Sequence, residues 1–587
     1  MITNTELEYK GDLYPSNIVD FKKDVDSVYF YTDNSVILKV TVLRDSLIRF
    51  RYTTKGYFSK DFSYAIDKTQ SHGYNFLEVI EEKERYKIKT SKVICAIDKV
   101  DLRVAITDLE GQCILEDELG FHWEESYHFG GNIVKMSKAS KEGECFYGMG
   151  DKASHANLKG KRVENWATDQ YAFHKDQEPL YKVVPFYIGL QNKQAYGIFF
   201  DNTFKTTFDF CHEKRNVTSY WADGGEMNYY FIYGPQMQDV VTTYTHLTGK
   251  PELPPLWALG YHQCKWSYYP ESKVKEVTSK FRELQIPCDA IYLDIDYMDG
   301  FRCFTWNKEY FPDPKRMVAE LAEDGFKTVV IIDPGIKIDK EYWVYKEALE
   351  KDYFCKRADG PYMKGKVWPG ECNFPDYTNP EVREWWAGLF KELISDFGVK
   401  GVWNDMNEPA VMEVPGKTFP MDVRHDYDGN PCSHRKAHNI YGTQMARATY
   451  EGVKQFAYPK RPFIITRSAY SGAQRYTSSW TGDNVASWEH LWIANIQMQR
   501  MSISGMGFTG SDIGGFAEQP SGELYARWIQ LGVFHPFCRT HSSGDHGDQE
   551  PWSFDVDVIN ITRKFVQLRY QLLPYLYTMF WEYINDG

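Results

Sequence analysis

The second half of the sequence alternates short apolar runs with helical segments, and this pattern limits the fold more than any other feature. Segments with helical periodicity include 272–284, 380–397 and 437–456, and 565–583 is expected to be the last helix. The runs that read as buried strands are 258–263, 290–294, 328–333, 401–405, 463–467, 478–483, 507–512 and 532–537. Eight parallel strands joined by helices close into a barrel. The sequence therefore predicts an α/β fold, a (β/α)8 TIM barrel, over 249–587.

The first part of the chain has a different pattern. Polar and apolar residues alternate in runs such as 35–42 and 46–52, which indicates half-buried strands. Three prolines in 249–256 mark a linker. A chain of 587 residues also exceeds what one hydrophobic core supports. We therefore expect an N-terminal β-sandwich domain over 1–248, before the barrel.

Two connections in the predicted barrel are too long for simple loops. They span about 337–378, after the third strand, and about 409–436, after the fourth. Both follow the carboxyl ends of strands, where barrel enzymes build their active sites. We expect these insertions, with the 160–180 loop of the N-terminal domain, to close one side of a pocket that admits only the end of a substrate chain.

Charged or titratable side chains follow nearly every predicted strand. Acids buried together are costly, and they persist where a ligand or a reaction uses them. Cleavage of a glycosidic bond needs two facing carboxylates, because one attacks or activates water while the other protonates the leaving oxygen. Asp405 and Asp483 are the candidate pair. The full set is Asp294, Asp296, Asp333, Asp405, Arg467, Asp483, Asp512 and His541.

Other side chains extend this candidate site. Trp403 and Asp405 alternate along one strand, so they share a face and put a sugar-stacking ring beside a carboxylate. Arg467 can bind hydroxyl groups and keep a neighbouring acid ionised, although a purely structural ion pair is the alternative. Four more aromatic residues are candidates for a sugar pocket, with ordinary core positions as the alternative: Trp266, Trp368, Trp480 and Phe516.

No metal or cofactor is expected. Asp294-Ile-Asp296 is similar to the DxD of metal-dependent glycosyltransferases, but here it ends a barrel strand, and Met298 stands where an EF-hand needs an acid. No His/Cys metal cluster and no Gly-rich phosphate loop occurs in the sequence. We therefore expect chemistry by protein side chains alone.

Charge and cysteine content narrow the partners and the compartment. The net charge of −13 is spread without long blocks of one sign, which argues against nucleic acid. Eleven cysteines, an odd number with no CxxC pair, fit reduced thiols. No signal peptide is visible, and no apolar run approaches the roughly 20 residues of a membrane span. We expect a cytoplasmic protein without a membrane partner; formation of a homo-oligomer stays open.

The motifs of the barrel resemble those of glycoside hydrolase family 31. The similarity is to its α-glucosidase branch, which contains glucosidase II and the lysosomal α-glucosidase. Two matching motifs are Trp403-Asn-Asp-Met-Asn-Glu-Pro409 and Trp480-Thr-Gly-Asp-Asn484. The other motifs lie at 293–298, 367–370, 467–468, 472–476, 510–516 and 539–541. The resemblance covers the barrel from end to end and the N-terminal part more loosely.

The resemblance implies roles for these residues. Asp405 is the expected nucleophile and Asp483 the expected general acid/base, and the N-terminal domain lends Asp169 to the site. The residues implied to bind the sugar in the −1 subsite are Asp294, Arg467, Asp512 and His541. Those implied to line this subsite are Trp266, Ile336, Trp368, Trp403, Met406, Trp480 and Phe516. The implied activity is that of a retaining, exo-acting α-glucosidase that hydrolyses terminal bonds of α-glucoside oligosaccharides by double displacement.

Alternatives on the same scaffold are an α-transglucosidase and an α-glucan lyase. An α-xylosidase is disfavoured, because that branch carries Phe-Gly-Glu where this chain has Met406-Asn-Glu408. A non-catalytic sugar-binding protein is the alternative from a different class. Family members also carry β-domains after the barrel, whereas this sequence stops at Gly587, so we expect a partial chain.

Overall fold

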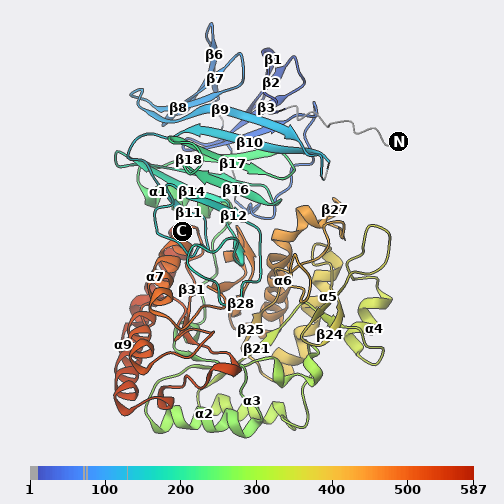
Figure 1. The fold of residues 1–587 in the computed structure, drawn as a ribbon, viewed down its shortest axis with the longest axis vertical. Helices are drawn as coiled ribbons and strands as arrows, with labels where there is room; N and C mark the ends of the chain where they lie inside the picture. The colour runs from blue at the N-terminus through green and yellow to red at the C-terminus, as the bar shows by residue number, and fades with distance from the viewer. Residues whose placement is uncertain (1–10, 71–72, 75–76, 129) are drawn as a thin grey trace, which may run out of the picture.

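The computed structural model describes residues 11–587 apart from 71–72, 75–76 and 129. Two β-sheets form one end of the molecule and a helix-covered barrel forms the other (Figure 1). The predicted fold class is confirmed.

The N-terminal part is two antiparallel sheets packed face to face. Their facing side chains form one apolar core. Strand β8 shows why the sequence folds this way, since Val104, Ile106 and Asp108 are buried while the residues between them are partly exposed. One sheet has the order β1 (Ile18–Lys23), β2 (Ser27–Thr32), β3 (Ile37–Arg44), β4 (Leu47–Thr53), β18 (Met227–Tyr233), β15 (Gln194–Phe200), β14 (Phe186–Gln191), β11 (Cys145–Gly148). The other has the order β12 (Arg162–Asn165), β16 (Thr206–Phe210), β17 (Val217–Ala222), β10 (Asn132–Ala139), β9 (Cys113–Glu125), β8 (Val104–Asp108), β7 (Val93–Asp98), β6 (Arg85–Lys89), β5 (Glu78–Glu81).

The barrel strands are parallel and follow the chain order. They are β19 (His262–Gln263), β20 (Ala290–Leu293), β21 (Lys327–Ile332), β25 (Gly401–Asn404), β28 (Ile464–Thr466), β30 (Ser478–Trp480), a divided seventh strand of β31 (Thr509–Gly510) and β32 (Asp512–Ile513), and β33 (Arg539–Thr540). Strand β31 pairs with β30, whereas β32 pairs with β33. Because β33 also pairs with β19, the ring closes.

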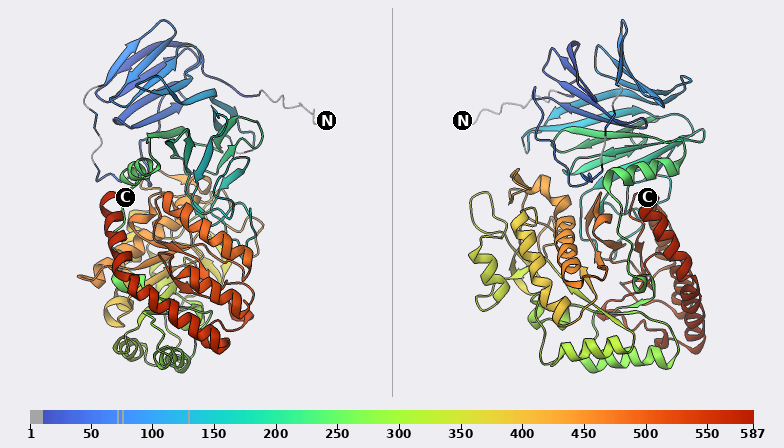
Figure 2. Two further views of the ribbon diagram at one scale, coloured as in Figure 1. Left: turned by 90° about the vertical axis from the view of Figure 1, so that its left-hand side faces the viewer. Right: turned by 180° about the vertical axis from the view of Figure 1, so that it is seen from behind.

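Helices cover the outside of this ring. They are α2 (Glu271–Glu283), α3 (Pro314–Glu323), α5 (Pro380–Lys391), α6 (His434–Ala457), α7 (Trp488–Ile503), α8 (Gly522–Gly532) and α9 (Val556–Asp586). Helix α9 runs along the barrel and ends close to the N-terminal sheets (Figure 2). No helix in the described part of the chain is long and apolar enough to cross a membrane.

The fifth unit of the barrel has no α-helix. The segment between the fifth and sixth strands holds a two-residue strand, β29 (Ala469–Tyr470), and a short 3-10 turn, Ala473–Arg475. The N-terminal part occupies the position of the missing helix. Helix α1 (Met237–Thr248) packs against the fifth unit, and β13 (Lys182–Val183) pairs with β29. The two parts of the chain thus share a core.

The predicted eighth strand, 532–537, is wrong. Gly532 is the last residue of α8, and the strand is Arg539–Thr540. The apolar run was misread because a buried helix end and the turn after it are as apolar as a strand. The first strand is likewise shorter than predicted, since a 3-10 turn occupies Leu256–Leu259.

Both long connections leave the carboxyl ends of their strands. The first contains β22 (Ile336–Lys337), α4 (Trp343–Glu350), β23 (Lys364–Val367) and β24 (Gly370–Asn373), and its strands form a small sheet. The second contains β26 (Arg424–His425) and β27 (Cys432–Ser433).

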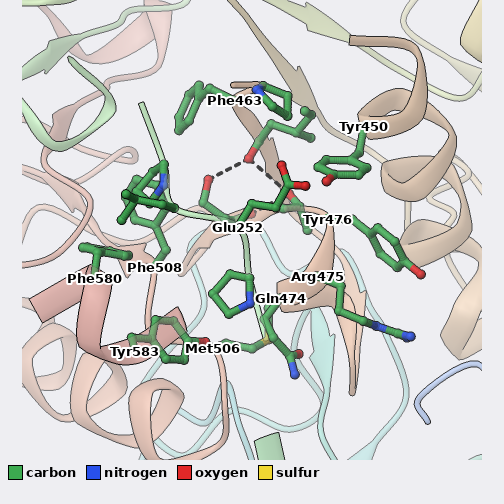
Figure 3. Close-up of a pocket in the computed structure, with 17 residues that line it drawn as sticks. Glu252, Tyr450, Phe463, Gln474, Arg475, Tyr476, Met506, Phe508, Phe580 and Tyr583 are labelled. Carbon is green, nitrogen blue, oxygen red and sulfur yellow. Dashed lines mark hydrogen bonds between the residues drawn. The ribbon is translucent and has the colours of Figure 1, made fainter. Parts of the chain in front are cut away.

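The opposite, amino-terminal face of the barrel is closed by the proline-rich segment. Glu252 of this segment lines a small cavity together with Phe463 and Phe508, which precede β28 and β31, and with Phe580 and Tyr583 of α9 (Figure 3). The cavity among them holds about 50 Å³. It is too small for a sugar, so this face serves stability.

Candidate active site

A pocket of about 270 Å³ lies among the predicted site residues, close to the lower end of the roughly 300–1,000 Å³ of ligand pockets. Its lining comes from the barrel strand ends, both insertions and the N-terminal part. The predicted residues on its wall are Asp169, Trp266, Asp294, Trp368, Trp403, Asp405, Met406, Arg467, Asp483, Phe516 and His541.

One buried arginine joins the two candidate carboxylates. Nε of Arg467 lies 3.1 Å from Asp405, and its Nη1 lies 3.5 Å from Asp483. Both acids follow barrel strands, so strands β25 and β30 set their positions. Met406, directly after Asp405, adopts φ +55°, a left-handed conformation that non-glycine residues hold mainly where surrounding structure forces it, often at functional sites.

The two carboxyl groups have different proton affinities. Burial raises the pKa of Asp405, and the Arg467 guanidinium opposes that rise. Burial holds the pKa of Asp483 well above its usual range, against Arg467, and Asp405 and Asp169 raise it further. Arg467 also lies closer to Asp405 than to Asp483. Of the two carboxyl groups, Asp405 is therefore the one favoured to carry the charge and Asp483 the one favoured to carry the proton, which is the arrangement that glycoside cleavage needs.

Glu408 was missed as a partner of Arg467. Its carboxylate accepts two hydrogen bonds of 2.9 Å from Nε and Nη2 of the guanidinium. Glu408 is fully buried, so this bidentate pair orients the arginine. The signal was present in the sequence, because a charged residue stands inside the motif around Asp405.

The N-terminal part reaches this site through the segment after β12. The Asp169 carboxylate lies 3.5 Å from Nη2 of Arg467. The backbone N–H of Ala172 donates to the carbonyl of Asp483, and the Tyr181 hydroxyl accepts from the N–H of Asp483. The same hydroxyl donates to the carbonyl of Gln170. Residues of the N-terminal part therefore position the acid/base candidate directly.

Asp294 and His541 form the opposite side of the pocket. His541 Nε2 lies 3.8 Å from Asp294 Oδ2, and burial raises the pKa of Asp294 well above its usual range. Burial lowers the pKa of His541 well below its usual range, so the ring is neutral. Nε1 of Trp403 and Nδ1 of His541 are buried without a partner among the described residues. Sugar hydroxyl groups suit such unpaired atoms.

A metal could be held at this same place. One ligand atom each of Cys264, Asp294 and His541 lies within 4.8 Å of the others. Only one of the three is a carboxylate whose charge would favour a cation, and its raised pKa disfavours that charge. The set therefore suits a hydroxyl-bearing ligand better than a cation.

Aromatic rings complete the wall. Trp266 and Trp368 meet edge to face with centroids 5.0 Å apart, which brings the first insertion onto the pocket. Phe516 lies 4.8 Å from His541, and Trp403 lies 5.2 Å from the same ring.

Three predicted site residues lie behind the wall. Ile336, Trp480 and Asp512 are almost completely buried and do not line the pocket. Trp480 packs against Trp403, and Asp512 accepts two hydrogen bonds from Arg539. They support the residues in front of them in this structure.

Six further lining residues were not predicted. They are Tyr171, Ile295, Ile331, Met412, Ser543 and Asp545. Ile295 directly follows the predicted Asp294, and Ile331 lies in β21, two residues before the predicted Asp333. The others come from segments with no periodic pattern, so the sequence carries no local signal for them.

Comparison with known proteins agrees with this architecture. The model of the glycosyl hydrolases family 31 TIM-barrel domain matches residues 251–579. The model of the glycosyl hydrolase 31 N-terminal galactose mutarotase-like domain matches residues 37–209.

Individual relatives cover most of the chain. It is 41% identical over 564 residues to alpha-glucosidase 2 of Bacillus thermoamyloliquefaciens, covering 96% of this chain and 70% of that protein. It is 37% identical over 504 residues to human neutral alpha-glucosidase C, covering 80% of this chain and 54% of that protein. The structure of the Flavobacterium johnsoniae GH31 dextranase complexed with glucose superposes with a TM-score of 0.91 at 31% identity, over 98% of this chain and 71% of that chain. With family models covering both parts of the chain, this protein belongs to glycosyl hydrolase family 31 and is a glycoside hydrolase.

Proposed function

We propose that the protein is a retaining, exo-acting α-glucosidase that removes terminal glucose from α-glucoside oligosaccharides. The observation that carries this proposal is the single guanidinium of Arg467 between two buried carboxyls, with the pKa of Asp483 held well above its usual range. Relatives named α-glucosidases support the substrate class.

The reaction follows from the two protonation states. Ionised Asp405 attacks the anomeric carbon while the carboxyl of Asp483 gives its proton to the leaving oxygen. The glycosidic bond breaks and an ester between the sugar and Asp405 forms. Asp483, now a carboxylate, takes a proton from water, and that water displaces Asp405 from the sugar. Glucose leaves with its original anomeric configuration, and both carboxyls return to their starting states.

The remaining polar residues are proposed to bind the sugar. Asp294 and His541 face its hydroxyl groups from one side, and Arg467 with Asp169 from the other. Asp512 and Trp480 act by holding the residues of the wall, and Ile336 packs behind it. Hydrogen bonds to hydroxyl groups that strengthen in the transition state raise kcat as well as affinity.

We further propose that residues 1–248 and 249–587 are the two domains, and that the first contributes Asp169 to the second. All eleven cysteines are free, which supports a reducing compartment such as the cytoplasm.

A panel of glucose disaccharides tests the function. Hydrolysis of α-linked disaccharides to glucose is expected, with an Asp405→Ala variant inactive although folded by circular dichroism. The panel also decides the preferred linkage. Turnover of β-linked disaccharides alone, or release of an unsaturated sugar instead of glucose, would contradict an α-glucosidase.

A further inference from the structure

A row of hydrogen-bonded histidines lies behind the pocket. Nδ1 of His425 lies 3.0 Å from Asp376 Oδ1, and its Nε2 lies 3.0 Å from Nδ1 of His434. Nε2 of His434 lies 2.9 Å from Nδ1 of His438. Nε2 of His438 lies 2.7 Å from the carbonyl oxygen of Ala167. The four side chains are buried, and the row ends two residues before Asp169.

The members of the row come from four parts of the fold. Asp376 follows the small sheet of the first insertion, and His425 lies on β26 of the second. His434 and His438 occupy the first turns of α6, one turn apart, so both side chains lie on the same face of the helix. Ala167 belongs to the N-terminal part. The row therefore ties both insertions and α6 to the segment that carries Asp169.

The carbonyl of Ala167 sets the tautomer of His438. A carbonyl only accepts, so Nε2 of His438 carries a proton. Burial lowers the pKa of His438 to about 3 and that of His434 well below its usual range, so both rings are neutral. Nδ1 of His438 therefore accepts a hydrogen bond, and both Nε2 of His434 and the Thr418 hydroxyl lie close enough to donate it, at 2.9 and 3.2 Å.

Asp376 anchors the other end of the row. Its carboxylate lies 3.0 Å from Nδ1 of His425 and also accepts from the hydroxyl and N–H of Thr378 and from the N–H of Asp426. These contacts fix the carboxylate and, through it, the ring of His425.

We propose that this histidine row positions Asp169: Asp376 anchors His425, and the rings of His434 and His438 connect His425 by hydrogen bonds to the carbonyl of Ala167. The inference rests on the proposed function, since it assigns Asp169 to sugar binding. Neighbouring contacts serve the same segment: Trp166 stacks on His438 with centroids 3.7 Å apart, Asn439 accepts from the N–H of Ala167, and Lys417 donates to the carbonyl of Asp169 at 2.8 Å.

The hydrogen bond from His438 to Ala167 can be tested without any sugar. In the full-length protein labelled with ¹⁵N-histidine, the ring signal of His438 is assigned by its loss in His438→Gln, and we expect a neutral ring protonated at Nε2. A His438 ring protonated at Nδ1 would overturn the proposal, as would one equivalent of zinc by elemental analysis, because Cys355, Asp376 and His425 are close enough to bind a metal.

A double-mutant cycle tests the positioning. Asp169→Ala and His438→Leu should each raise KM for 4-nitrophenyl α-glucoside by about tenfold, and the double variant should raise it no further than Asp169→Ala alone. His438→Gln keeps a donor toward Ala167, so its KM should stay within about twofold of the unsubstituted enzyme. Should His438→Leu fail to fold, Asp376→Asn replaces it in the cycle.

The matched control is His262→Leu. His262 is also fully buried and hydrogen-bonded, to Tyr292 and Trp257, but outside the row. The increase in KM caused by His262→Leu should multiply with the increase caused by Asp169→Ala when both changes are combined. If the increases caused by His438→Leu and Asp169→Ala also multiplied, the positioning role would be refuted. Unchanged kinetics of Asp169→Ala would instead refute the assignment of Asp169 to the site, while the NMR result would stand.

Discussion

The ring of Tyr181 occupies the space that a side chain at position 482 would need. A Cβ placed on Gly482 would lie 2.1 Å from a ring carbon of Tyr181, and Gly482 has φ +76°. The residue from the N-terminal part therefore packs against the backbone next to Asp483, and its hydroxyl binds the Asp483 N–H. The acid/base candidate is placed by a contact between the two parts of the chain.

Gly482→Ala should displace Asp483. The clash and the positive φ both penalise a Cβ, so we expect kcat to fall about 100-fold and the free energy of unfolding to fall by about 1–3 kcal/mol. Gly388→Ala is the control, because Gly388 lies in α5 with nothing within 4 Å of the added carbon. Steady-state kinetics and urea unfolding measure both. Unchanged kcat in Gly482→Ala would show that the contact does not position Asp483.

The stereochemistry of the first product tests the double displacement. Two successive inversions at the anomeric carbon leave its configuration unchanged, so proton NMR during early turnover should show α-glucose before mutarotation. Asp405→Ala cannot form the ester intermediate, and its kcat should fall by at least about 10⁴-fold. First appearance of β-glucose would mean that water attacks directly and that Asp405 is a base.

The pH profile of kcat/KM should have an acid limb set by Asp405 and an alkaline limb set by Asp483. Asp405 works ionised, so activity falls as pH drops through its pKa, and burial moves that limb above the usual ~3.9. Asp483 works protonated, so activity falls as pH rises through its pKa, which burial holds well above its usual range. A dinitrophenyl glucoside needs no protonation of its leaving group and should lose the alkaline limb. An alkaline limb that persists with this substrate would belong to another group.

Products from a long α-glucan test the closed pocket. Trp368 stands on the pocket wall although it belongs to the first insertion, so the insertion shapes the sugar site. Free glucose should appear from the start, and Trp368→Ala should raise KM about tenfold. Trp343→Ala, in the same insertion but 45% exposed and away from the pocket, should leave KM unchanged. Early oligosaccharides without glucose would indicate an open cleft and endo-acting cleavage.

Local pattern was enough to predict the barrel and much of its site. Strands such as β21 and β25 are buried on both faces, so they appear in the sequence as continuous apolar runs. Parallel strands bring their carboxyl ends to one face, which is why the sequence pattern alone assigns Asp294, Asp405 and Asp483 to one pocket. The strand predicted at 532–537 was wrong, because a buried helix end and a buried strand are both built from apolar residues.

Tertiary structure alone decided how the site is held. The sequence determined which acids stand at strand ends. The contacts of Tyr181 with Asp483 and of His438 with Ala167 instead join residues far apart in the chain, where spacing and periodicity carry no information. The missing helix of the fifth unit has the same cause, since α1 supplies its packing from another part of the chain. Proton affinities also belong to the folded state: Asp405 and Asp483 are the same residue type, and burial, Arg467 and the neighbouring carboxylates set their pKa values.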